Sequence, residues 1–115
     1  MNEFLFLFRS EEKNIQSLSP DEMQEYISKW AVWTRRLNDS GKLKHGDKLS
    51  WTDATVLKDF GNAVTDGPYI ESKEVIGGYM VILANDMREA SEIAKECPIY
   101  NVKGSLEVRT STQHM

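Results

Sequence analysis

The segment EFLFLFR, residues 3–9, decides the fold of this chain. Five consecutive apolar residues occupy positions 4–8, which is the length of a strand, and Arg9 ends the run. Because neighbouring side chains of a strand point to opposite faces of a sheet, an uninterrupted apolar run indicates a strand that is covered on both faces. A second run of this kind, YMVIL at residues 79–83, follows the pair Gly77-Gly78. The two runs therefore predict a sheet with apolar side chains on both of its faces.

The segment after the first run has the signature of a long amphipathic helix. Ser19 is a typical N-terminal cap, Pro20 suits the first helical position, and Glu22 stands three residues after the cap. Apolar residues then recur at steps of three and four. Gly41 is placed for a left-handed C-terminal cap. The pattern predicts a helix over residues 20–39 with one packed face.

The C-terminal part of the chain also alternates strand, helix and strand. After the run at 79–83, Asp86 and Glu89 form a second capping box, and Pro98 ends the apolar helical face that follows. Residues 106–109 alternate apolar and charged side chains. This alternation is typical of an edge strand or of a strand with a single buried face.

Residues 43–66 contain short segments separated by turn residues. The turn at 59–62 is flanked by residues 54–58 and 63–65, which predicts an antiparallel hairpin. His45 falls in a stretch rich in glycine, aspartate and lysine, which we interpret as a turn. The whole order is then strand, helix, strand with a hairpin, strand, helix, strand. This βαββαβ order is that of an α+β, ferredoxin-like sandwich with an inserted β-hairpin.

In this topology both helices lie on one face of the antiparallel sheet, and the other face is bare. Since both runs are apolar at consecutive positions, that face would form a larger apolar patch than soluble monomers usually carry. A second copy of the chain on this face would give an isologous homodimer, a dimeric α+β barrel with a sheltered cleft. The alternative is that residues 43–66 fold over the face.

Composition limits the class of protein. The 115 residues fit one domain, residues 1–115, and the 18 acidic and 14 basic side chains are spread without charged blocks. The net charge of −4 and the lack of a basic, aromatic-rich motif disfavour nucleic acid as a partner, although RNA-recognition domains share the βαββαβ order. No apolar run approaches the roughly 20 residues of a membrane span. We therefore expect a cytoplasmic protein with no membrane partner.

The sequence has few residues of the types that usually bind metals, and their spacing predicts no metal site. The two histidines and Cys97 lack metal-ligand spacing, and neither HExxH nor CxxC occurs, so we expect no metal and no cofactor. A single cysteine cannot form an internal disulfide. Cys97 lies on the apolar face of a predicted helix end. It is either a buried small hydrophobe or, as the alternative, a nucleophile.

A series of motifs resembles the DGPF-type branch of the YCII-related family. The motifs are Ser19-Pro20-Asp21-Glu22, Gly41-Lys42-Leu43, Gly46-x-x-Leu49, Thr65-Asp66-Gly67-Pro68-Tyr69, Glu71, Lys73-Glu74, Gly77-Gly78-Tyr79, Glu89-Ala90, Ala94, Cys97-Pro98, Gly104 and Glu107-Val108-Arg109. The resemblance spans nearly the whole chain and implies a dimeric α+β barrel. It also implies a cleft in which YCII-type members are proposed to use a histidine and aspartate pair, and some relatives act on chlorinated aromatic intermediates.

The resemblance places the histidine of that pair at or near Trp30, where this chain has no imidazole. His45 and His114 lie outside the predicted helix, so neither replaces it. A lone carboxylate can act as a general base when burial raises its pKa, which leaves Asp66 as the candidate catalytic residue. Asp66 precedes Gly67-Pro68. The alternative is therefore that its carboxylate accepts backbone N–H bonds and fixes a turn.

The candidate ligand-binding residues are Trp30, Tyr69, Glu71, Lys73 and Tyr79. If the loop that carries Glu71 and Lys73 lies over the dimer cleft, Lys73 can bind an anionic ligand that Glu71 orients. The alternative is that these charged side chains are solvated and contribute little to stability. Tyr69 and Tyr79 are walls either of the core or of the cleft. Trp30 is likewise either a core residue or part of the cleft lining.

These features favour a protein that binds an unknown small molecule in a cleft at the sheet and dimer interface. Weak acid/base enzymatic activity through Asp66 is an extension of this hypothesis. The alternative is a non-catalytic dimerisation or regulatory module, which the missing helix histidine supports.

Overall fold

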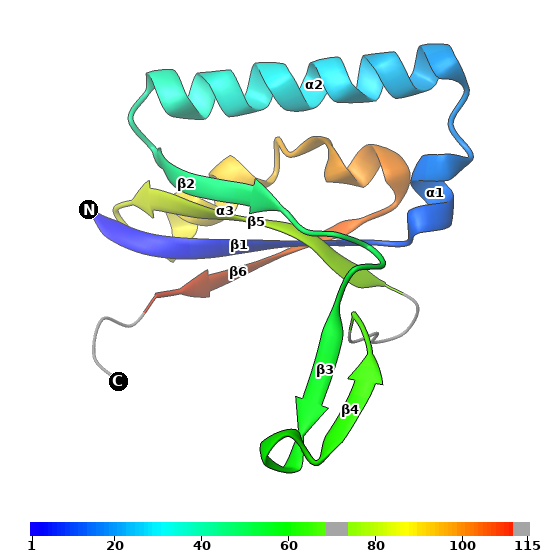
Figure 1. The fold of residues 1–115 in the computed structure, drawn as a ribbon. Helices are drawn as coiled ribbons and strands as arrows, with labels where there is room; N and C mark the ends of the chain where they lie inside the picture. The colour runs from blue at the N-terminus through cyan, green and yellow to red at the C-terminus, as the bar shows by residue number, and fades with distance from the viewer. Residues whose placement is uncertain (69–73, 112–115) are drawn as a thin grey trace.

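The computed structural model describes residues 1–68 and 74–111 (Figure 1). The elements are β1 (Asn2–Ser10), α1 (Glu12–Gln16), α2 (Pro20–Asp39), β2 (Leu43–Lys48), β3 (Thr55–Lys58), the 3-10 turn η1 (Asp59–Gly61), β4 (Ala63–Asp66), β5 (Val75–Ala84), α3 (Met87–Ala94), the 3-10 turn η2 (Pro98–Val102) and β6 (Ser105–Thr110). The two predicted helices, the apolar strands and the hairpin are confirmed. The turn predicted around His45 is wrong, because β2 forms there.

The main sheet has four antiparallel strands in the order β2-β5-β1-β6. β3 and β4 form a separate two-stranded sheet. The helices pack on one face of the main sheet, and α2 runs along that side (Figure 1). The architecture confirms the prediction of an α+β, ferredoxin-like fold with an inserted hairpin. β6 lies at the edge of the sheet, which is one of the two placements that its alternating pattern predicts.

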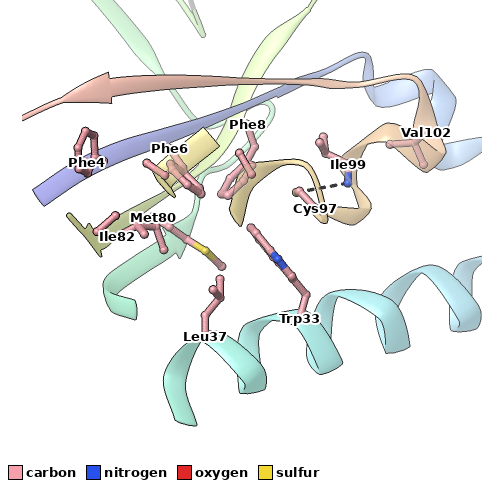
Figure 2. Packing of buried hydrophobic residues seen from close by; sticks show 13 residues of the cluster. Phe4, Phe6, Phe8, Trp33, Leu37, Met80, Ile82, Cys97, Ile99 and Val102 are labelled. Carbon is pink, nitrogen blue, oxygen red and sulfur yellow. Dashed lines mark hydrogen bonds between the residues drawn. The ribbon is translucent and has the colours of Figure 1, made fainter. Parts of the chain in front are cut away.

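The two faces of β1 have different surroundings. Phe4, Phe6 and Phe8 are buried and pack with Trp33 of α2 and with residues of α3 and η2. Figure 2 shows Trp33 directed from α2 toward Phe8, and their ring centroids are 6.2 Å apart. Leu5 points to the opposite face, where it is only half-buried. The alternation along one apolar run therefore separates a packed core face from a second apolar face.

Local hydrogen bonds set both ends of α2. The Ser19 hydroxyl oxygen accepts from the Glu22 backbone N–H at 3.1 Å, and Glu22 accepts in return from the Ser19 backbone N–H at 2.9 Å. That backbone bond holds the pKa of Glu22 below its usual value. At the other end Gly41 has a φ of 73°, and the Lys42 N–H donates to the Leu37 carbonyl at 2.9 Å. Both predicted caps are confirmed.

We expect Ser19→Ala to lower the free energy of unfolding by about 1 kcal/mol, because it leaves a helix-terminal N–H without its side-chain acceptor. The matched control is Ser28→Ala on the exposed middle of α2, where alanine favours the helix and should slightly raise stability. Urea unfolding followed by circular dichroism measures both. Equal effects of the two substitutions would contradict a capping role for Ser19.

The chain between β1 and α2 contains a short helix. Residues 12–16 form the short helix α1, and Ile15 and Leu18 pack against the core. Apolar contacts with distant residues thus order a segment whose own composition is mostly polar. Such contacts cannot be predicted from the pattern of neighbouring residues in the sequence.

The glycine pair before the second apolar run permits an irregularity in the sheet. The β1–β5 register shifts between Phe8 and Arg9, which pair with Gly78 and Ile76 and leave Gly77 as the extra residue. Trp51 lies against this bulge, with ring atoms 3.0 Å from the position of a Cβ on Gly77. Glycine at position 77 therefore accommodates both the bulge and the close approach of the Trp51 ring.

Candidate functional site

The face of the main sheet opposite the helices, called the open face here, is the candidate site. Its apolar side chains, all half-buried, are Leu5, Leu7, Ile76, Tyr79, Val81 and Leu83. Charged pairs border them: Lys44 Nζ lies 2.7 Å from Glu3 Oε1, and Arg9 Nη2 lies 3.2 Å from Glu107 Oε1. An apolar centre within a polar rim is the usual anatomy of a binding surface.

A hollow of about 510 Å³ lies on the open face. It is lined by Leu5, Leu7, Leu49, Pro68, Ile76 and Tyr79. Leu49 follows β2 and Pro68 follows β4, so the ends of the hairpin excursion form one wall of the hollow. Small-molecule sites typically have volumes of about 300–1,000 Å³, mostly apolar walls and a few polar groups. The volume of the hollow falls within this range, and its lining is almost wholly apolar.

A hydrogen-bonded pair lies beside this hollow, whose own lining is almost wholly apolar. The Tyr79 hydroxyl lies 2.6 Å from Nε2 of His45, and the two rings meet edge to face with centroids 5.4 Å apart. At Nε2 a neutral imidazole can accept a hydrogen bond from the phenolic O–H. In the other tautomer its Nε2–H donates a hydrogen bond to the phenolic oxygen. In either arrangement the tyrosine oxygen keeps a lone pair for a ligand hydroxyl.

Sequence reasoning missed His45. The β2 residues contain glycine, aspartate and lysine, which are poor strand formers, so the segment looks like a turn. The alternation gives no signal either, because the register shifts between Leu43, which packs against the core, and His45. In the structure His45 pairs with Val81 and Asp47 pairs with Tyr79. The pairing brings the imidazole to the open face.

Trp30 lies on the other side of the sheet from Tyr79. Its ring centroid is 5.1 Å from that of Phe8 and 5.5 Å from that of Trp33, both in edge-to-face geometry. It therefore packs in the layer between α2 and the sheet. The structure does not bring Trp30 and Tyr79 together.

Asp66 ends β4 at the base of the hairpin and is exposed. The base is closed by the Gly67 N–H, which donates to the Ala54 carbonyl at 2.8 Å, and a cis Gly67-Pro68 bond follows. Within residues 1–68 and 74–111 no group donates a hydrogen bond to the Asp66 carboxylate. The candidate residues Tyr69, Glu71 and Lys73 lie outside the described part of the chain.

Cys97 is buried beside η2, where its sulfur accepts from the Ile99 N–H at 3.5 Å (Figure 2). Burial raises the pKa of the thiol to about 12. Because the thiolate is the reactive form, this residue is a small core hydrophobe and not a nucleophile.

Two classes of site have no candidate among the residues that the structure describes. In these residues no group of three or more histidine, cysteine, aspartate or glutamate side chains could hold a metal ion. None of the helices within the same ranges combines the length and apolar character needed to cross a membrane.

A comparison with models of protein families gives a match to this chain. The model of the YCII-related domain matches residues 3–113, nearly the whole chain. No curated protein matches the sequence. The matched range includes all four strands of the main sheet, and hence the whole open face.

Proposed function

The chain belongs to the YCII-related domain family, and on this premise we propose that it is a homodimeric, cytoplasmic protein that binds a small organic molecule on the open face. We also propose that it belongs to the DGPF-type branch. The observation that carries the proposal is the hollow of about 510 Å³ whose apolar wall includes Tyr79, hydrogen-bonded to His45. It is a concave apolar surface with a polar pair beside it, and ligand sites typically combine these two features.

The lining favours an aromatic or alicyclic ring that carries one hydroxyl group. The ring would pack on Leu5, Leu7 and Ile76, and the hydroxyl would donate to the Tyr79 oxygen. Acid/base chemistry follows from the same arrangement. A ligand O–H proton can pass to the Tyr79 oxygen while the phenolic proton passes to Nε2 of His45, which conserves atoms and charge over the three groups.

Asp66 is a second candidate base in this proposal. It stands two residues before Pro68, which lines the hollow, while Asp66 itself is exposed and lies outside the lining. The same hypothesis gives Trp30 a role in ligand binding, and its ring packs on Phe8 in the helix layer.

Thermal unfolding with phenol and toluene tests the proposal, because these rings are similar in size and differ in the hydroxyl group. Both should raise the midpoint of the wild type, since a ligand of the native state stabilises it. Phenol should bind about three- to tenfold more tightly, the equivalent of one hydrogen bond. Tyr79→Phe should remove this preference.

The matched control for Tyr79→Phe is Tyr100→Phe. Tyr100 is also partly exposed, but its hydroxyl donates to the Ala94 carbonyl at 2.9 Å, in the helix layer. This variant should keep the wild-type preference for phenol. If neither ring raises the midpoint of a dimeric wild type, ligand binding at this hollow is wrong, and the alternative of a non-catalytic dimerisation or regulatory module gains support.

A further inference from the structure

The β3–β4 hairpin presents apolar side chains that the described chain does not bury. Leu57 and Val64 are directly paired across the two strands, so they share one face of the hairpin, and they are 63% and 58% exposed. Phe60 in the tip is fully exposed and has a φ of 56°. A two-stranded hairpin without further packing is marginally stable in water. This one makes its main contacts within itself.

The hairpin starts at the open face and extends away from the helices. Leu49 and Pro68, which precede and follow it, both line the hollow. Figure 1 shows β3 and β4 leaving the body in the direction away from α2. Four strand residues extend about 13 Å, and facing sheets pack about 10 Å apart. The tip is therefore long enough to pass the level of a second sheet stacked on the open face.

The open face is formed by the 9, 6, 10 and 6 residues of β1, β2, β5 and β6, which at 3.3 Å along and 4.8 Å across the strands cover roughly 500 Å² in plan. Stable interfaces bury about 800 Å² of accessible surface on each partner. The apolar hairpin is continuous with the open face and would add contact area to a dimer formed through it.

We propose that the β3–β4 hairpin is an arm that reaches past the open face and packs Leu57, Val64 and Phe60 on the flank of a second copy of the chain. The inference rests on the homodimer of the proposed function. In a two-fold dimer each copy both gives and receives an arm, so the added area counts twice. Each arm also carries Pro68 at its base, which makes dimerisation and the shape of the ligand hollow interdependent.

Sedimentation equilibrium of paired variants tests the arm. The arm variant is Leu57→Ser with Phe60→Ser, and the matched control is Ile27→Ser with Val32→Ser. The control removes two exposed apolar side chains of α2, which are 57% and 50% exposed. The wild type should have a mass near twice 13.2 kDa. The arm variant should raise the dimer dissociation constant at least tenfold, and the control should leave it unchanged.

A third variant, Leu7→Glu, separates failure of the arm from failure of the dimer. It places a charge in the centre of the open face and should dissociate the dimer. If the wild type stays at 13.2 kDa at every concentration, both the homodimer and the arm are wrong. If Leu7→Glu dissociates the dimer and the arm variant does not, only the arm is wrong.

Photocrosslinking gives a readout that does not depend on weakening the dimer. Phe60→Cys is labelled with benzophenone maleimide, whose aromatic ring replaces the lost one; the buried thiol of Cys97 should not react. The control carries the label at Ile27→Cys on α2. Irradiation should give a covalent dimer from the label at position 60 and none from position 27. If the label at position 60 cross-links only within one chain, the proposed arm is wrong.

Discussion

Phe6→Ala is expected to lower the free energy of unfolding by about 3–5 kcal/mol. Phe6 lies in the middle of β1, between β5 and β6, and its side chain is 0% exposed. Removing the ring forfeits its burial and leaves a cavity that the paired strands cannot close. Small domains are stable by about 5–15 kcal/mol in total, so this loss is a large share. Urea unfolding with a fluorescence or circular dichroism signal measures it.

Leu7→Ala is the control on the same strand, one residue away and directed to the open face. Leu7 is half-buried, so its truncation should cost only about 1 kcal/mol in the monomer, from partial loss of apolar burial. The measurement is made at protein concentrations where the chain is monomeric. Similar losses for Phe6→Ala and Leu7→Ala would contradict the assignment of the two faces.

Gly104→Ala is expected to lower the free energy of unfolding by about 2–3 kcal/mol, although it adds a single methyl group. A Cβ at this position would lie 2.5 Å from Cγ1 of Ile99 and 2.7 Å from the carbonyl oxygen of Arg9. The backbone of Arg9 cannot move away, because β1 is hydrogen-bonded to a strand on each side. The clash must be relieved by movement of η2 or of β6. Urea unfolding detects the resulting loss.

A double-mutant cycle with Ile99→Ala tests the cause of that loss. Ile99→Ala alone should destabilise by about 2–5 kcal/mol, because Ile99 is buried. It also removes Cγ1 and Cδ1, the two side-chain atoms nearest to the added methyl group. The two substitutions together should therefore cost less than the sum of the single effects. Simple additivity would show that crowding against Ile99 is not the reason for the glycine.

Most of the fold was predictable from local patterns. The capping box at Ser19, the cap at Gly41 and the hairpin around residues 59–62 each depend on residues close in sequence. The apolar runs at 4–8 and 79–83 determined the central strands and, by their lack of alternation, the second apolar face. Tyr79 was identified as a candidate ligand residue, and it lines the hollow.

The composition of the candidate site depended on tertiary structure. His45 and Tyr79 are 34 residues apart in sequence and meet only because β2 pairs with β5 in one particular register. Trp30 and Tyr79 lie in different layers because α2 packs on the face of β1 that holds Phe8. The sequence by itself therefore determined the elements and their order, since caps and periodicity are local. Only the tertiary structure decided which side chains share a face, because strand register and layer packing are properties of the whole chain.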